Sequence, residues 1–143
     1  MALRDDRNPG SVRPMEEAQE VCGRYFSEFL PQWGGRLLLP ELASLSCVFG
    51  IVIEDIESAA WVVEIERGRL VRVRPVSGDL ALELEAQATF VTDHETFLEV
   101  VSAKTAPSEA FFSTLIDIAG DMELGLSLST VLEPFFRAYP FRL

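Results

Sequence analysis

The stretch Thr105–Leu128 reads TAPSEAFFSTLIDIAGDMELGLSL and decides the fold of this 143-residue chain. Pro107 suits the first turn of a short helix, because the N–H that a proline lacks would have no partner there. The segment Leu115–Ala119, apolar except for Asp117, ends at Gly120, which predicts a strand followed by a turn. Asp121 is a good helix-capping residue, so a final helix should follow it. The stretch therefore predicts a helix, a strand and a helix in succession.

Four more strands are expected upstream of this stretch. They are Val48–Glu54, Trp61–Arg67, Arg69–Pro75 and Ala88–Thr92. Val48–Glu54 is nearly all apolar, which is typical of a central strand covered on both faces. Gly68 separates the second strand from the third and predicts a tight turn, so the first three strands should form a meander. Ser77–Asp79 is expected to be a loop, and Leu80–Glu85 has mixed character.

A long helix is expected to begin at Met15, because apolar residues recur every three or four positions from there to Phe29. Pro31 should end it. Residues 1–14 hold prolines and a glycine among charges, which predicts a flexible lead-in. Residues 15–143 contain no repeat, low-complexity tract or linker, so they should form a single domain.

Several residues in this order of elements resemble the sterol carrier protein 2 (SCP2) domain. That family has an Ala-Phe pair before its fifth strand, as at Ala110-Phe111, and Gly-Asp/Asn-Met before its last helix, as at Gly120-Asp121-Met122. Further matches are Trp61, the helix start in Thr92–Leu98, Pro107, Ile118, Leu126 and Leu128. The resemblance implies an α+β fold in which a mixed five-stranded sheet carries helices on one face around an apolar cavity.

Members of that family bind sterols, fatty acyl chains or isoprenoids in the cavity and use neither a metal nor a catalytic residue. The resemblance and the apolar last helix direct our ligand-binding prediction to six residues: Phe111, Phe112, Met122, Leu126, Val131 and Phe135. Side chains of this size either line a cavity or fill it. The first hypothesis is therefore a non-enzymatic lipid carrier. The alternative is a protein-interaction or regulatory domain with a filled pocket, such as an accessory subunit in a lipid-pathway complex.

The charge balance bears on the partners. The chain has 23 acidic and 12 basic residues, a net charge of −11. Binding to nucleic acid needs clustered bases, so nucleic acid is not an expected partner. The same charge predicts weak or no binding to membranes. The beginning of the chain shows no secretory signal and no apolar run is long enough to span a bilayer, so a cytoplasmic location is expected.

The sequence offers no recognisable metal, cofactor or catalytic site. Cys22, Cys47 and His94 are the only Cys and His residues, too few for a structural zinc site. Both cysteines are expected to be small buried side chains. His94 should be a solvated residue in the first turn of a helix, where Thr92 and Glu95 are spaced as a capping box. Neither a nucleophile–base pair nor a cofactor motif is present, so no enzyme activity is expected.

Two further features have open roles. Four arginines, Arg67, Arg69, Arg72 and Arg74, form the basic run Arg67–Arg74, which suits either an anion site or, as the favoured interpretation, the protection of an edge strand. Pro134 should interrupt the last helix. The aromatic tail Phe135–Leu143 is too apolar to stay in solvent, so it should dock as a lid, a core plug or an interface. An interface there would bring a homodimer or a protein partner.

Overall fold

The computed structural model describes residues 7–76 and 86–142. The helices are α1 (Arg7–Arg24), α3 (His94–Val101), α4 (Pro107–Phe112), α5 (Met122–Val131) and α6 (Glu133–Ala138). The strands are β1 (Cys47–Ile53), β2 (Ala60–Glu66), β3 (Arg69–Pro75), β4 (Ala88–Thr92) and β5 (Ile116–Gly120). The loop Ser77–Asp79, the segment Leu80–Glu85 and residues 1–6 of the predicted lead-in lie outside the described residues.

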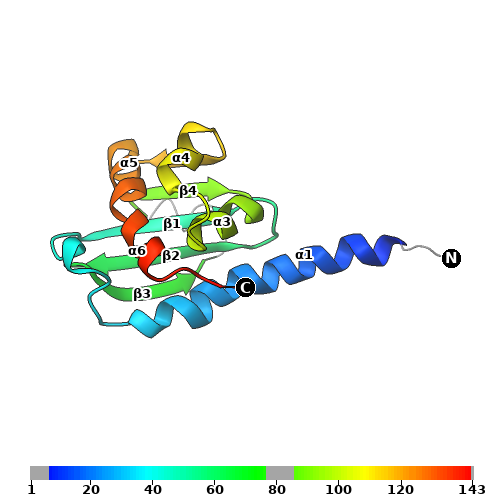
Figure 1. Cartoon of the computed structure of the whole chain (residues 1–143), viewed down its shortest axis with the longest axis horizontal. Coiled ribbons are helices and arrows are strands. Elements are labelled where there is room, and N and C mark those ends of the chain that lie inside the picture. The colour runs from blue at the N-terminus through cyan, green and yellow to red at the C-terminus, as the bar shows by residue number, and fades with distance from the viewer. Residues whose placement is uncertain (1–6, 77–85, 143) are drawn as a thin grey trace.

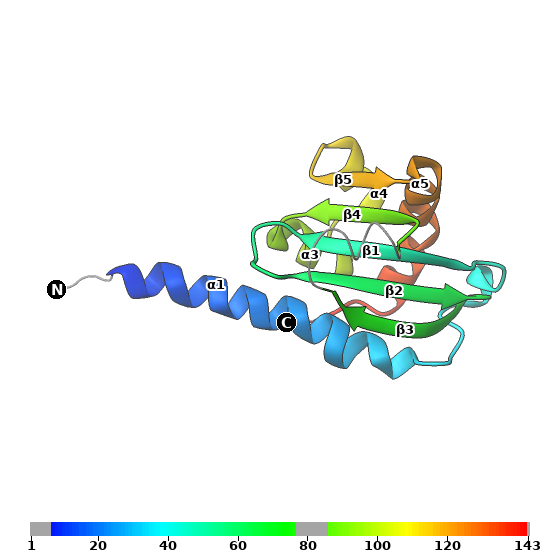
Figure 2. The same ribbon diagram turned by 180° about the vertical axis from the view of Figure 1, so that it is seen from behind.

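The strands form one mixed five-stranded sheet in the order β3-β2-β1-β4-β5 (Figures 1 and 2). β1 pairs in antiparallel fashion with β2 and in parallel fashion with β4, and the other two pairings are antiparallel. The meander, the central place of the first strand and the α+β class are therefore confirmed. Each predicted strand is present, with its ends shifted by no more than one residue.

A tight turn joins β2 to β3, as expected from Gly68. Arg67 and Gly68 both have positive φ, 52° and 75°, which is the geometry of a type I′ hairpin. A β-carbon on Gly68 would stand 2.4 Å from the carbonyl oxygen of Leu42. Only glycine fits there, because the neighbouring atom is rigid backbone.

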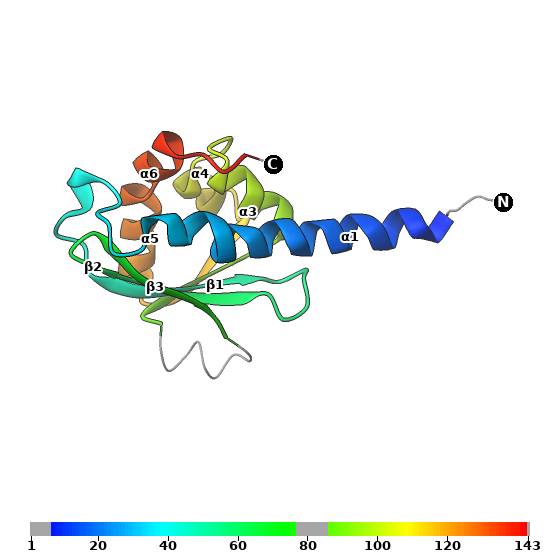
Figure 3. The same cartoon turned by 90° about the horizontal axis from the view of Figure 1, so that it is seen from below.

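The described helices cover a single face of the sheet (Figure 3). α1 runs along the β3 side of the sheet and continues past it toward the N-terminus (Figures 1 and 2). The helix begins at Arg7 rather than at Met15, so residues 7–14 are helical and not irregular as predicted. Pro9 falls in the first turn, where a missing N–H costs nothing, which is why it does not prevent this earlier start. The division of the chain into a lead-in and a domain at residue 14 stays a prediction.

α1 ends in a change of helix type. Its last turn passes into a π-helical turn, Tyr25–Phe29, and then into a 3₁₀ turn, Leu30–Trp33. The chain next runs along β3, where the N–H groups of Gly35 and Leu38 donate to the carbonyls of Leu70 and Gly68 at 2.7 and 2.8 Å. This segment therefore supplies hydrogen-bond partners for some of the backbone groups at the outer edge of the sheet.

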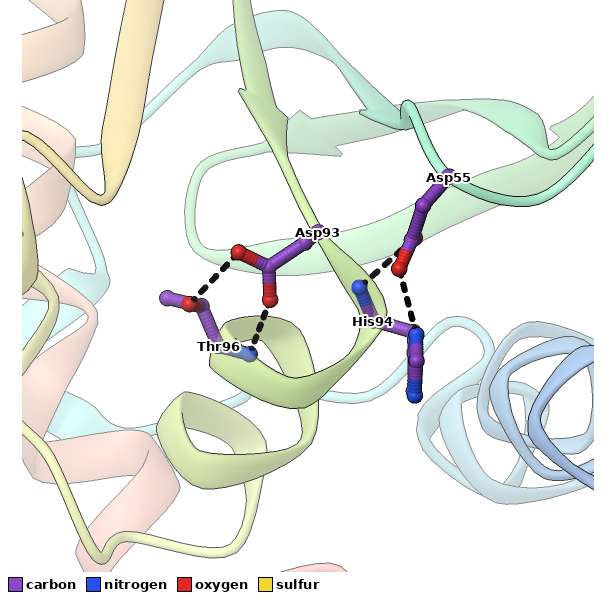
Figure 4. Close-up of polar contacts among 4 residues, drawn as sticks. All are labelled: Asp55, Asp93, His94 and Thr96. Atoms are coloured by element: carbon purple, nitrogen blue, oxygen red, sulfur yellow. Dashed lines mark hydrogen bonds and ion pairs between the residues drawn. The ribbon is translucent and has the colours of Figure 1, made fainter. Parts of the chain in front are cut away.

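The start of α3 differs from the predicted capping box. The N-cap is Asp93, whose carboxylate accepts the Thr96 N–H at 2.7 Å and the Thr96 hydroxyl at 3.2 Å (Figure 4). Thr92 is the last residue of β4, and its hydroxyl donates to the carbonyl of Leu115 at 3.0 Å. The prediction that Thr92 caps Glu95 was wrong because strand pairing extends through Thr92 and moves the helix start by one residue.

The last helix is interrupted at Pro134, as predicted. α5 ends at Val131, and α6 begins at Glu133 with Pro134 in its first turn. No helix in residues 7–76 and 86–142 is long and apolar enough to cross a membrane.

Candidate functional site

An apolar cavity of about 90 Å³ lies between the sheet and the helices. Its wall draws on nearly every element of the fold. The lining residues are Tyr25, Leu30, Leu38, Phe49, Ile51, Val63, Ile65, Leu70, Phe90, Thr92, Phe97, Val100, Val101, Pro107, Ile116, Leu128, Ser129, Leu132, Phe135 and Phe136. None of these twenty side chains is charged.

Strand alternation sets the sheet side of the wall. Phe49 and Ile51 of β1 are two residues apart, as are Val63 and Ile65 of β2, so each pair projects from the same face. Phe49 lies directly opposite Val63 in the antiparallel register. The face toward the helices is therefore hydrocarbon across the centre of the sheet.

Helix periodicity sets the other side. Leu128, Leu132 and Phe136 follow one another at steps of four from α5 into α6, which brings them to one face. α3 contributes Phe97 and Val101 at the same spacing. The helical side of the wall is therefore also made of uncharged side chains.

Three polar side chains interrupt this wall. The Thr92 hydroxyl donates to the Leu115 carbonyl, and the Ser129 hydroxyl donates to the Leu126 carbonyl at 2.7 Å. Tyr25 is 2% exposed, and within the described part of the chain its hydroxyl makes no hydrogen bond. Burial raises the pKa of Tyr25, so its hydroxyl is protonated at neutral pH. The hydroxyl is thus buried without a hydrogen-bond partner in that part of the chain, and the surface that faces the cavity is almost wholly apolar.

Only Phe135, among the six residues predicted to bind ligand, lines this cavity. Phe112 is 77% exposed and Met122 is 45% exposed. Phe111 is half-buried and contacts Phe112, with ring centroids 5.4 Å apart. Leu126 and Val131 are half-buried outside the wall.

The geometry of α5 explains the correction. Leu126 is two residues from Leu128, which places it about 200° around the helix, on the side away from the cavity. Leu128 and Leu132 do line the wall. Sequence reasoning missed Tyr25 and the strand residues, although the alternation in Trp61–Arg67 was a usable signal for Val63 and Ile65.

The tail of the chain packs beside the cavity. Phe141 is 7% exposed, and its N–H donates to the Val101 carbonyl at 2.8 Å. Its ring lies 5.2 Å from those of Tyr25 and Phe29. Tyr25, Phe26, Phe29, Trp33, Trp61, Phe97, Phe135 and Phe141 form the buried aromatic cluster, joined by ring contacts such as the 4.2 Å stacking of Phe26 on Trp61. The tail docks as predicted, whereas its roles as lid or interface stay predictions.

His94 lies in the first turn of α3 as predicted and is partly exposed, but it also has a partner that was not predicted. Its ring Nδ1 lies 2.6 Å from Oδ2 of Asp55, and its backbone N–H donates to Oδ1 of the same carboxylate at 2.9 Å (Figure 4). Asp55 follows β1 by two residues, so this contact ties the start of α3 to the β1–β2 turn. The pairing spans 39 residues, which is why local sequence did not reveal it.

No cluster of three or more potential metal ligands occurs among the described residues. Cys22 and Cys47 are free and buried, as expected. Burial raises the pKa of the Cys22 thiol to about 12, with a smaller contribution from Asp55, and that of Cys47 to about 11. Both thiols are therefore protonated and poor nucleophiles at neutral pH.

Three arginines of the basic run, Arg69, Arg72 and Arg74, lie on the edge strand β3, where edge protection was expected, and Arg67 lies in the turn before it. Arg72 pairs with Glu64 of β2 at 3.2 Å. Arg69 donates from Nη1 to the Gly35 carbonyl at 3.3 Å, beside the segment that covers the edge. These contacts are with neighbouring strands and loops of the same chain.

Comparison with known proteins identifies the fold. Residues 26–133 match the model of the SCP-2 sterol transfer family. A crystal structure of sterol carrier protein 2 superposes with a TM-score of 0.58 at 14% identity and covers 84% of this chain and 90% of that one. The sterol carrier protein domain 2 of Helicoverpa armigera gives 0.53 at 21% identity, with coverages of 84% and 88%.

A possible sterol carrier protein from Thermus thermophilus gives a TM-score of 0.54 at 14% identity, with 88% of each chain covered. No curated protein matches the sequence. The structural likenesses establish the fold, and the family model spans most of the chain. This protein belongs to the SCP-2 sterol transfer family.

Proposed function

We propose that this protein binds or carries a lipid in the apolar cavity without chemically changing it. The observation that carries the proposal is the wall itself, in which twenty side chains from both layers include no charge. Burying hydrocarbon yields about 0.8 kcal/mol per CH₂, so a sixteen-carbon chain gains on the order of 10 kcal/mol before the costs of ordering. Membership of the SCP-2 sterol transfer family supports this ligand class.

The cavity must widen to admit such a ligand. It measures about 90 Å³, whereas pockets for small molecules usually enclose roughly 300 to 1,000 Å³. The strands are held by backbone hydrogen bonds in a continuous ladder, while α5 and α6 meet the sheet through side chains. Expansion is therefore expected on the helical side, where no ladder has to break.

A protein-interaction role is the second candidate, and the small cavity favours it. The exposed Phe112, Leu115 and Met122 offer apolar surface for a partner. A ubiquinone synthesis protein, UbiJ-SCP2, shares the fold with a TM-score of 0.52 at 14% identity, covering 85% of this chain and 94% of that one. An accessory role in a lipid pathway is consistent with that likeness. The cytoplasmic location, weak membrane binding and homodimer stay predictions.

Binding measurements on two matched variants test the lipid proposal. Val63→Phe adds bulk to the cavity wall, and Val71→Phe makes the same change on β3, where the side chain is 49% exposed. A fluorescent acyl analogue should bind the natural protein and Val71→Phe alike, and bind Val63→Phe at least tenfold more weakly. Circular dichroism checks that both variants are folded, since overpacking costs about 1–3 kcal/mol.

Native mass spectrometry after gentle purification gives an independent result. Co-purifying lipid supports the carrier function. If the analogue does not bind at saturating concentration and no lipid co-purifies, the proposed carrier function is wrong. The protein-interaction role is then the candidate that remains.

A further inference from the structure

The two edges of the sheet differ in what covers them. At β3, the carbonyls of Leu70 and Gly68 accept hydrogen bonds from the segment that follows α1, and arginines add charge to the strand. β5 forms the opposite edge, and in the described part of the chain it pairs only with β4 (Figure 2). An uncovered edge strand is a template on which another extended chain can pair. The β5 edge is therefore the place where this sheet can accept a further strand.

The register shows which backbone groups of β5 are free. The Asp121 N–H, one residue beyond the end of β5, donates to the Gln87 carbonyl at 2.9 Å. Hydrogen-bonded and non-hydrogen-bonded pairs alternate along an antiparallel ladder. Counted back from this bond, Ile116, Ile118 and Gly120 direct their N–H and C=O groups away from β4. These groups have no partner among the described residues.

Exposed apolar side chains lie at both ends of this strand. Phe112 ends α4, Leu115 comes directly before β5, and Met122 begins α5. Among the other described residues, only Val71 and Tyr139 are large apolar side chains with a comparable exposure. Apolar surface beside an open edge suits a partner that pairs with the backbone and covers the neighbouring side chains.

The charge around the β5 edge has one sign. Residues 105–136 contain no lysine, arginine or histidine, and the acidic residues Glu109, Asp117, Asp121 and Glu123 are exposed there. A second copy of this chain would bring the same acids together, and like charges opposite one another destabilise a strand pair. A partner with lysines or arginines would be attracted instead. The charge therefore favours a basic partner over a dimer at this edge.

We propose that β5 accepts an extended segment of another protein as an added strand, and that this segment alternates basic with apolar residues. β5 itself sets the alternation, because Ile116 and Ile118 are buried whereas Asp117 and Ala119 are exposed. Side chains of adjacent strands pair on the same face of a sheet, so the bases of the partner lie beside Asp117 and its apolar residues beside the isoleucines. The inference rests on the protein-interaction role, for which it supplies the chemistry of the partner, and is independent of lipid binding.

Titration of the full chain with three short peptides of equal length tests this mode of binding by amide NMR. In the first peptide lysine and valine alternate, in the second glutamate replaces lysine, and the third has the composition of the first in two blocks. The alternating lysine peptide should shift the amide signals of Ile116, Ile118 and Gly120 and slow their exchange with solvent. The glutamate peptide should not bind, and the block peptide should bind more weakly because its side chains do not match the two faces. Added salt should weaken the binding.

Matched variants locate the contact. Asp117→Lys and Glu57→Lys change the net charge equally at exposed positions, the first on β5 and the second in the β1–β2 turn. Asp117→Lys should weaken the alternating lysine peptide about fivefold or more, since an attraction becomes a repulsion, and Glu57→Lys should leave it nearly unchanged. Phe112→Ser should also weaken it, whereas Val71→Ser, an exposed change on the other edge strand, should not.

The outcomes separate this inference from the functions proposed above. If no peptide binds, if the shifted amides lie away from β5, or if the block peptide binds equally well, strand addition at β5 is wrong, and a protein-interaction role through another surface is still open to test. A dimer seen by light scattering that Asp117→Lys alters would assign the edge to a second copy and overturn the inference. Binding of the fluorescent acyl analogue should be the same in all four variants, so the lipid proposal stands or fails separately.

Discussion

Two groups of aromatic side chains differ sharply in burial, although the sequence presents both as runs of neighbouring aromatic residues. The buried aromatic cluster brings together residues from the two turns that follow α1, from β2, from α3 and from the C-terminal tail, and Phe135 is 2% exposed. Phe111 and Phe112 form a pair on α4, where Phe112 is 77% exposed. The cluster is covered because segments distant in sequence meet there. Aromatic content therefore does not locate the cavity; the overlap of layers does.

Removing one ring from each group should produce the largest difference in the free energy of unfolding. Phe135→Ala removes a ring that lines the cavity and that lies 5.4 Å, between ring centroids, from Trp33. The free energy of unfolding should therefore fall by about 3–5 kcal/mol. Phe112→Ala removes an exposed ring and should change it by less than about 0.5 kcal/mol. Urea denaturation measures both. Similar losses in the two variants would mean that the exposed pair is covered in solution.

The contact between His94 and Asp55 should have a smaller effect on the same cluster. Asp55→Ala removes both hydrogen bonds that hold the start of α3, the helix that carries Phe97 into the cluster. We expect a loss of about 1–2 kcal/mol, because bonds to a charged acceptor are strong but these groups are partly exposed to solvent. Glu57→Ala, an exposed acid in the same turn, is the control and should be neutral. Equal stability of the two variants would show that the contact contributes nothing.

Alkaline pH should produce the smallest effect. The Cys22 thiol ionises near pH 9.0 when unfolded, and burial raises its folded pKa to about 12; for Cys47 the rise is to about 11. Because the raised values belong to the folded state, their stabilisation is full below pH 9 and is lost as pH rises toward 11–12. The free energy of unfolding should thus decline above pH 9, less steeply in Cys22→Ala. Denaturation curves at pH 8, 9 and 10 measure the slope. An identical slope in both proteins would contradict this explanation.

Local patterns predicted most of the fold. Apolar alternation, the glycine turn at Gly68 and the proline at Pro134 act within a few residues, so the strands, the hairpin and the break between the last two helices were found. The resemblance in Thr105–Leu128 supplied the family and with it the mixed sheet. The start of α1 was missed because prolines among charges suggest irregular chain, whereas the first turn of a helix accepts a proline such as Pro9; Pro14, the eighth residue of α1, is not explained in this way.

The candidate site was predicted poorly from the same sequence. Five of the six predicted ligand residues lie outside the cavity wall, since the choice followed apolar character and not the face of each helix. Val63 and Ile65 could have been chosen from strand alternation. Tyr25 could not, because its apolar surroundings come from Phe97 and Phe141, far along the chain.

The sequence by itself determined the acidic character of the protein, the order of its helices and strands and the presence of an apolar face on each, because charge and periodicity are properties of neighbouring residues. Only the tertiary structure decided which side chains enclose the cavity, that Asp55 holds His94 and that the Tyr25 hydroxyl is left without a partner in the described part of the chain. Those facts depend on which distant segments meet. Which segments meet is determined by how well their side chains fit together and form hydrogen bonds across the whole chain.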